Sequence, residues 1–142
     1  MLIAVGCDID SISLKEEAVE YLKLWGHEIQ DFGATLEDKA EYPKYAYLVA
    51  KSVAKKQAVR GILFSDTGLE MAVVANKVKG VRAVRCVNWR EANFARQVLS
   101  SNVLCMGNDA DLWQVMDNWL AVEFEMKNDQ VVMQITQIEQ AE

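Results

Sequence analysis

The stretch that decides the fold is Gly61–Lys77, which reads GILFSDTGLEMAVVANK. Its apolar first part, Gly61–Ser65, predicts a buried strand, and the run Leu69–Val78 predicts a helix directly after it. The turn between them is polar and contains a glycine, Gly68. A strand that passes through a short polar turn into a helix is the unit on which α/β proteins build small-molecule sites. The turn is therefore the first candidate site.

The same alternation of strand and helix extends along the whole chain. Further strands are predicted at Leu2–Gly6, His27–Phe32, Val81–Cys86 and Asn102–Met106. Further helices are predicted at Ser13–Trp25, from Pro43 to Val53, and at Glu91–Leu99, Asp109–Phe124 and Asp129–Gln140. Ser13 and Glu16 have the spacing of a capping box. Because the strands are almost wholly apolar and alternate with helices, we expect a single α/β domain over residues 1–142, with a five-stranded parallel sheet between two helical layers.

The composition is that of a folded globular protein, with 51% hydrophobic and 25% charged residues. The net charge is −6 and no basic stripe is present, so nucleic acid is not an expected partner. No apolar stretch reaches the roughly 18 residues that span a membrane. The N-terminal residues lack a basic leader, which favours a cytoplasmic location. Three cysteines without paired spacing argue against a disulfide framework and are expected to be buried: Cys7, Cys86 and Cys105.

Ligands bind outside the carboxyl ends of the strands in open parallel sheets. This rule places Asp8, which follows the first strand, at the same edge as Asp66 and Glu70. The only histidine, His27, precedes the second strand and is expected at the opposite edge, as a surface residue. Glu70 also suits the first turn of a helix for electrostatic reasons alone, because the helix dipole favours a carboxylate there.

Several separated blocks of the sequence resemble the family of ribose-5-phosphate isomerase B and the galactose-6-phosphate isomerase subunits. They are IAVGCD, HEIQDFGA, EYPKYA, RGIL, the TG of the turn, ANKVKGVRA and SNVLCMG. The resemblance implies a Rossmann-like α/β/α fold, no cofactor, and dimers whose active sites are built across two chains. It also implies aldose–ketose isomerisation of a sugar phosphate through an enediolate, which needs an acid, a base, amide donors and cations for the phosphate.

The resemblance assigns roles to residues around the turn. Asp8 matches a residue that contacts the sugar, and Ile9 replaces the histidine that usually follows it. Ser65 stands where the family has its catalytic cysteine, and Glu70 replaces a loop glycine. The catalytic candidates are therefore Ser65 and Glu70, and the expected substrate-binding residues are Asp8, Ile9, Asp66, Thr67, Gly68 and Leu69.

Other family positions carry residues that cannot perform the family's chemistry. Val98 replaces the ring-opening histidine, and Leu99 replaces the asparagine beside it. Asp109 stands where an arginine is common, and Asn128 and Val132 replace the phosphate-binding arginines of the tail. Asp66 and Glu70 add negative charge near the expected phosphate, where two like charges about 4 Å apart repel by roughly 4 kcal/mol at an effective dielectric of 20.

Three hypotheses follow from this divergent site. In the first, the protein is an isomerase in which Glu70 or Asp66 is the base, because Ser65 is expected to lack a neighbouring base. Its phosphate would be held by Arg82, Arg85, Arg90 or another chain. In the second, the protein is a non-catalytic sugar-binding relative, or a subunit of an isomerase with an unlike family chain. In the third, a carboxylate cluster holds Mg²⁺ as in a phosphatase, with Asp8, Asp10, Asp66 and Asp109.

The final predicted helix, Asp129–Gln140, is more apolar than a free tail should be. We expect it to dock on a partner subunit, as the tail of the family does. The resemblance therefore implies a homodimer or tetramer, with packing on its own chain as the alternative for this helix.

Overall fold

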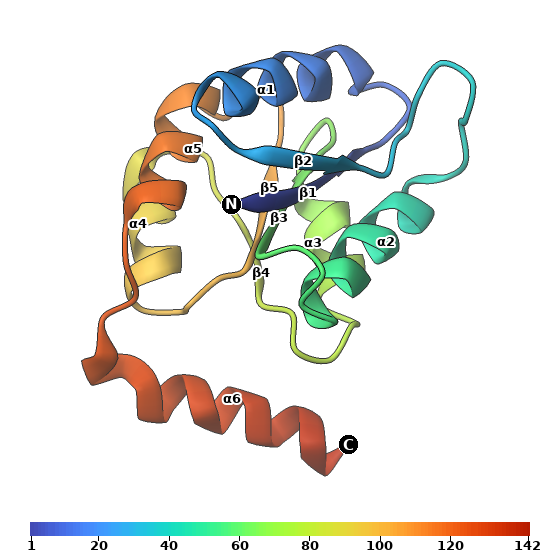
Figure 1. Ribbon diagram of the computed structural model, residues 1–142. Helices are drawn as coiled ribbons and strands as arrows, with labels where there is room; N and C mark the ends of the chain where they lie inside the picture. The colour runs from blue at the N-terminus through green and yellow to red at the C-terminus, as the bar shows by residue number, and fades with distance from the viewer.

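A five-stranded, wholly parallel sheet forms the centre of the molecule (Figure 1). A computed structural model describes all residues from Met1 to Glu142. The strand order is β2-β1-β3-β5-β4. The strands are β1 (Leu2–Cys7), β2 (Glu28–Asp31), β3 (Arg60–Phe64), β4 (Ala83–Arg85) and β5 (Val103–Met106). The predicted five-stranded parallel sheet is confirmed.

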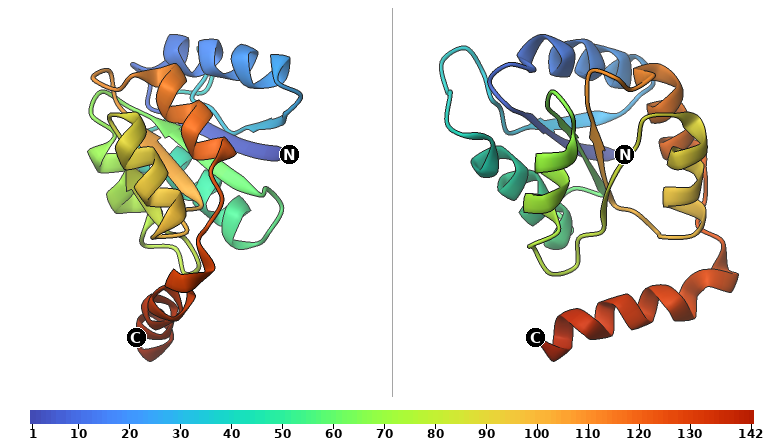
Figure 2. Two further views of the ribbon diagram at one scale, coloured as in Figure 1. Left: turned by 90° about the vertical axis from the view of Figure 1, so that its left-hand side faces the viewer. Right: turned by 180° about the vertical axis from the view of Figure 1, so that it is seen from behind.

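Helices cover both faces of the sheet, as expected (Figures 1 and 2). They are α1 (Ile12–Leu24), α2 (Tyr42–Ala54), α3 (Leu69–Ala75), α4 (Trp89–Gln97), α5 (Leu112–Ala121) and α6 (Asp129–Ala141), with a short 3-10 turn at Met126–Asn128. One core cluster lies under α1, α4 and α5, and includes Leu22, Ala92 and Trp119. The other lies under α2 and α3, and includes Val49 and Met71. The fold is thus a Rossmann-like three-layer α/β/α sandwich.

The first helix begins earlier than the sequence indicates. Its N-terminal cap is Ser11, and no side chain caps it, so the capping box of Ser13 and Glu16 is wrong. The reason is the turn before the helix, in which the Ser11 N–H donates to the Asp8 carbonyl and starts the helical path two residues sooner. Ser13 consequently lies inside α1 and is exposed.

The strand β4 is shorter than the predicted Val81–Cys86, with only three residues. Side-chain amides take the backbone groups at its start. The Asn102 side chain accepts from the Arg82 N–H at 2.7 Å, and the Asn76 side chain bonds both backbone groups of Ala83. These contacts tie the edge strand to the helix before it and to the strand beside it.

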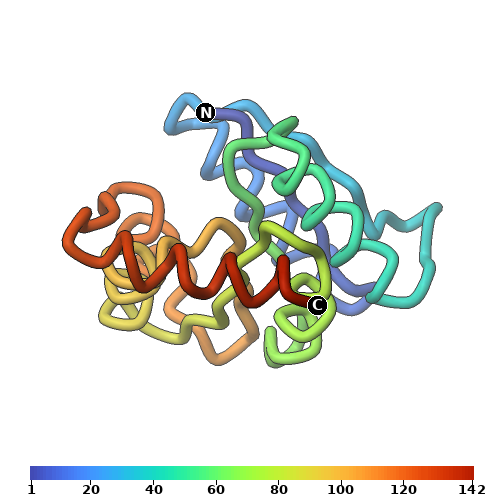
Figure 3. The backbone as a smooth tube through the Cα atoms, turned by 90° about the horizontal axis from the view of Figure 1, so that it is seen from below, coloured from blue at the N-terminus to red at the C-terminus, as the bar shows by residue number.

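The C-terminal helix α6 lies apart from the sandwich (Figures 1 and 2) and, seen from below, runs across its underside (Figure 3). Val132 is its only buried residue, and the Glu139 carboxylate accepts from the Gly80 N–H at 3.0 Å. Its other large apolar side chains are exposed: Val131, Met133, Ile135 and Ile138. Docking of this helix on a partner subunit stays a prediction. None of the helices combines the length and hydrophobicity that crossing a membrane requires.

Candidate functional site

The turn after β3 is held against the end of β5 by two glycines. A Cβ at Gly107 would lie 2.6 Å from the Asp66 carbonyl oxygen, and a Cβ at Gly68 would lie 3.0 Å from the Met106 carbonyl carbon. Gly68 also has a φ of +77°, which side chains disfavour. The Asn108 N–H donates to the Asp66 carbonyl at 2.8 Å. The position of the turn therefore depends on the absence of side chains at both points.

A hydroxyl–carboxylate network lies inside this turn. The buried Ser65 hydroxyl donates to one oxygen of the Glu70 carboxylate, and the Thr67 hydroxyl donates to the other at 3.2 Å. The Ser65 oxygen in turn accepts from the Gly68 N–H at 2.8 Å. The expectation that Ser65 lacks a neighbouring base is therefore wrong. Glu70 lies in the first turn of α3, from which its side chain reaches back to the start of the loop.

Backbone donors around the network are free. The N–H groups of Asp66, Thr67 and Glu70 donate to no group of the chain, because the turn carries them past the end of the β3 ladder and into the first turn of α3. Free N–H groups of this kind can stabilise an oxyanion that develops on a bound substrate.

Asp8 lies next to the turn, as expected from the topology. Its backbone N–H donates to the Phe64 carbonyl at 3.1 Å, which puts it beside Ser65 at the carboxyl edge. Its Oδ1 atom is buried and has no hydrogen-bond partner. A buried acceptor without a donor is rare in folded proteins and points to a donor supplied from outside the chain. The apolar neighbours Ile9 and Leu69 are both exposed at this edge.

Only one of the three proposed phosphate anchors reaches the turn. The Arg85 Nε donates to the Thr67 carbonyl at 2.9 Å, and its Nη2 pairs with Asp109 at 3.0 Å. Arg82 lies at the opposite end of β4, where burial lowers its pKa and its Nε donates to the Ser100 carbonyl. Arg90 stacks over the Trp89 ring instead.

The other carboxylates of this edge do not gather around a common point. Asp66 Oδ1 accepts from the Asn108 side chain at 2.9 Å, and Asp109 is paired with Arg85. No group of three or more histidine, cysteine, aspartate or glutamate side chains is arranged to hold a metal ion. The carboxylate cluster on which the phosphatase hypothesis depended, with Asp8 and Asp10, is therefore not formed.

The residues that the resemblance placed at the family's acid position lie at the end of another helix, away from this turn. Val98 ends α4, which starts beyond the carboxyl end of β4 and runs back along the sheet. Val98 and Leu99 consequently lie towards the amino edge of their own chain. His27 lies at that edge too, as predicted, since the next residue donates its N–H to the Met1 carbonyl. Burial lowers the pKa of His27.

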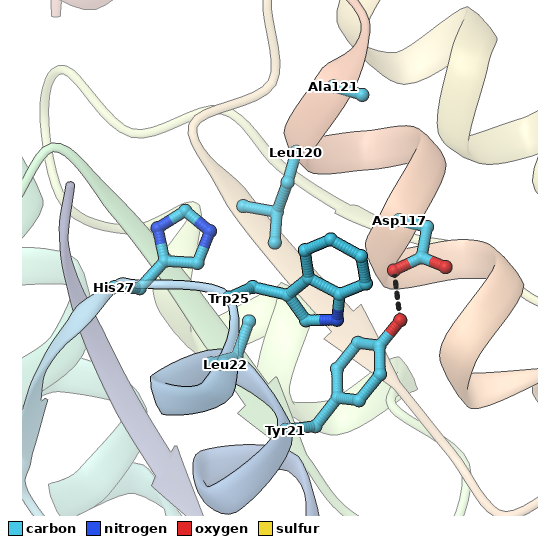
Figure 4. A pocket seen from close by; sticks show the side chains of 7 residues that line it. All are labelled: Tyr21, Leu22, Trp25, His27, Asp117, Leu120 and Ala121. Carbon is cyan, nitrogen blue, oxygen red and sulfur yellow. Dashed lines mark hydrogen bonds between the residues drawn. The ribbon is translucent and has the colours of Figure 1, made fainter.

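A hollow of about 360 Å³ opens between α1 and α5, away from the turn (Figure 4). The Tyr21 hydroxyl donates to Asp117 at 2.5 Å across it. The hollow is lined by Tyr21, Leu22, Trp25, His27, Asp117, Leu120 and Ala121. No sequence signal pointed to it, because its walls come from helices almost a hundred residues apart. It contains no lysine or arginine, so it lacks the cation that a phosphate needs.

Comparisons with known proteins agree with this geometry. A family model described as Ribose/Galactose Isomerase matches residues 3–138. Ribose-5-phosphate isomerase B of Escherichia coli (strain K12) is 38% identical, and the match covers 97% of this chain and 96% of that protein. The galactose-6-phosphate isomerase subunit LacB of Clostridium acetobutylicum is 32% identical, over 89% of this chain and 73% of that one.

The fold comparison is equally extensive. The solved structure of Clostridium thermocellum ribose-5-phosphate isomerase B superposes with a TM-score of 0.94 at 34% identity, and the match covers 99% of both chains. Matches of this extent in both sequence and fold show that the chain belongs to the ribose/galactose isomerase family of sugar-phosphate isomerases.

Proposed function

We propose that this protein interconverts an aldose phosphate and the corresponding ketose phosphate through an enediolate, with Glu70 as the base. The contact of the Glu70 carboxylate with the Ser65 and Thr67 hydroxyls supports this most directly. It puts a carboxylate beside the family's cysteine position, and carboxylates serve elsewhere as bases next to carbonyl groups.

The proton transfers can be assigned to atoms. In the aldose-to-ketose direction, Glu70 takes the proton from C2 and returns it to C1, and the hydroxyl proton passes from O2 to O1, so the carboxylate ends as it began. The Ser65 and Thr67 hydroxyls hold the carboxylate in place, and Ser65 acts as a hydrogen-bond donor because its hydroxyl is directed at the Glu70 carboxylate. The free N–H groups of Asp66 and Thr67 stabilise the negative charge on the enediolate oxygen.

The rest of the substrate is held by groups around the turn. Asp8 Oδ1, buried without a donor, accepts a hydrogen bond from a sugar hydroxyl. Ile9 and Leu69 form apolar walls, and Gly68 keeps the turn close to β5, so that its neighbours face the ligand. Arg85 supplies positive charge for the phosphate, in place of the arginines absent from the tail. Because Val98 cannot donate a proton, the substrate binds in its open-chain form.

A second copy of the chain completes the proposed enzyme. The exposed apolar side chains of α6 support a homodimer in which each α6 packs on the other subunit. The buried free thiols agree with a reducing, cytoplasmic location. Sedimentation velocity with an Ile135→Asp/Ile138→Asp variant tests the dimer, which should dissociate to monomers.

Solvent-deuterium exchange tests the reaction itself. Wild-type protein is incubated in D₂O with ribose-5-phosphate or galactose-6-phosphate, the sugars that the names of its relatives specify. We expect deuterium at the carbon next to the carbonyl together with aldose–ketose conversion. Glu70→Gln should slow both by about a hundredfold to ten-thousandfold, as loss of a general base does.

The matched control is Glu91→Gln, which changes a first-turn acid of another helix. It should leave the exchange rate unchanged. Exchange that is insensitive to Glu70→Gln would remove Glu70 as the base. Tight binding of a sugar phosphate without any exchange would instead favour the non-catalytic hypothesis, which also draws support from Val98 and Leu99 standing where the resemblance places a histidine and an asparagine.

A further inference from the structure

Lys15 is a buried lysine that takes no part in the proposed reaction. Its side chain is only 1% exposed, and its ammonium donates to Asp31 Oδ1 at 2.8 Å and to the Ala34 carbonyl at 2.7 Å. Burying the charge of Lys15 costs solvation energy that its partner Asp31, whose side chain is 37% exposed, offsets only in part, and apolar replacements of buried charges in ion pairs are often as stable. Stability alone therefore gives no reason for a lysine here.

The contacts of Lys15 hold the backbone that follows β2. Asp31 Oδ1 also accepts from the Gly33 N–H at 2.9 Å, so the pair closes a turn over Asp31–Ala34. This turn is then bonded to the end of β1. The Cys7 N–H donates to the Gly33 carbonyl at 2.7 Å, and the Ala34 N–H donates to the Cys7 carbonyl at 3.1 Å.

The end of β1 leads directly to the sugar side of the site. Asp8 follows Cys7, and its carbonyl accepts from the Ser11 N–H at 3.2 Å. The Ser11 carbonyl in turn accepts from the Lys15 N–H, which returns the chain of contacts to its start. Lys15 thus belongs to a closed ring of hydrogen bonds and peptide bonds. Asp8 is part of this ring through its backbone, and its side-chain Oδ1 is buried and unpaired.

We propose that Lys15 is a positioning residue for the sugar-binding end of the site, because it fixes the Gly33–Ala34 backbone against Cys7 and thereby sets the place of Asp8. This inference rests on the proposed function for the identity of the ligand. Lys15 does not touch the substrate, since its ammonium is enclosed and engaged by two acceptors.

The first test is a comparison of Lys15→Met with Lys23→Met, a change to an exposed lysine on the same helix. Lys15→Met should raise KM for the sugar phosphate by about tenfold to a hundredfold, the range expected when a binding group is misplaced by about 1 Å. Its kcat should change far less, and Lys23→Met should change neither. A merely structural lysine would lower the active fraction, and hence apparent kcat, without moving KM; that result would overturn the inference.

The double variant Lys15→Met/Asp31→Asn separates positioning from stability. It leaves no unpaired buried charge, so its Tm should return towards that of wild type if Lys15→Met or Asp31→Asn lowers it. Its KM should stay raised, because the Ala34 carbonyl still lacks its donor. Recovery of KM together with Tm would contradict the proposed role, and it would do so even if a single variant failed to fold.

Amide hydrogen exchange gives a readout that does not need turnover. Lys15→Met should exchange faster at Cys7, Gly33 and Ala34 than wild type, while the β3–β5 ladder keeps its protection. Equal exchange at these three amides would overturn the inference. If the wild-type protein shows no turnover, that result contradicts the proposed function but not the role of Lys15. The exchange pattern and the Kd for ribose-5-phosphate would then still decide that role.

Discussion

The two edges of the sheet differ in polarity. The carboxyl edge carries the polar turn on which we propose the site, and the amino edge carries a mostly apolar hollow. The turn at the carboxyl edge carries a carboxylate held by two hydroxyls and has free N–H groups, and Asp8 beside it has a buried unpaired oxygen. The amino edge has a hollow of about 360 Å³ with mostly apolar walls. Polar groups that are free to bond a ligand, and not the volume of a cavity, are the reason that we propose the site at the carboxyl edge.

The largest difference between the two edges is expected when a glycine at each edge is replaced by alanine, which adds one methyl group. Gly107→Ala puts a Cβ 2.6 Å from the Asp66 carbonyl oxygen, so the turn must move. We expect turnover to fall by about a hundredfold or more, and the free energy of unfolding to fall by about 1–3 kcal/mol. Steady-state assays and urea denaturation measure both.

Gly26→Ala is the counterpart at the amino edge. Gly26 has a φ of +87° but no atoms within 4 Å of an added Cβ. Its cost is backbone strain alone, about 1 kcal/mol, with turnover unchanged. If the two variants lose activity equally, the two edges do not differ as stated.

Arginine variants sharpen the comparison within the carboxyl edge. Arg85→Gln removes the cation that contacts the turn, and KM for a phosphorylated sugar should rise by about tenfold, as for the loss of one charged hydrogen bond. Arg90→Gln, whose guanidinium stacks on Trp89, is the control and should leave KM unchanged. An equal rise of KM in both variants would show that Arg85 does not bind the phosphate specifically.

The pH dependence of the free energy of unfolding tests whether the thiols at the carboxyl edge stay protonated in the folded protein. Burial raises the pKa of Cys7 from 9.0 to about 11 and that of Cys86 to about 12. Both thiols stay neutral in the folded protein while unfolded thiols ionise near pH 9, so their contribution to stability is complete below that pH and is lost as the pH rises towards 11. The free energy of unfolding should fall over this range.

Alkylation of the native protein checks the same point chemically. Iodoacetamide at pH 8 should leave turnover unchanged, because the thiolate is the reactive form and both thiols are buried. Rapid inactivation with one equivalent bound would show that a cysteine takes part in the reaction.

The smallest effect is expected at the hollow. Trp25 is 69% exposed, and Trp25→Ala should change the free energy of unfolding by no more than about 0.5 kcal/mol. Turnover of sugar phosphate should remain within about twofold of wild type, as for surface changes outside a site. A large loss of turnover in Trp25→Ala would instead indicate that the site lies at the amino edge.

The sequence predicted the fold better than the contacts around the turn. The apolar runs of Gly61–Ser65 and its counterparts are short and bounded by turns, so their order along the chain could be predicted, and so could the edge of the sheet that Asp8 and Glu70 share. The contact of Glu70 with Ser65 could not, because it depends on which way a side chain in the first helical turn points.

Other features depend on packing between distant segments. Arg85 was one of three candidate arginines, and only the short β4 and its register with β5 placed it beside Thr67. The bond from Lys15 to Ala34 joins α1 to a loop after β2, and no local pattern signals such a contact. The capping box at Ser13 failed for a local reason, since a turn at Asp8–Ser11 had already started the helix.

The separation of α6 from the sandwich has a consequence for how the protein behaves on dilution. An isolated helix of 13 residues is marginal in water, and this one buries only Val132 within its own chain. If a second copy supplies the missing contacts, mass action links the helix to protein concentration. Circular dichroism should then record a loss of helical signal at nanomolar concentration that reverses on reconcentration, while the sheet and its five flanking helices persist.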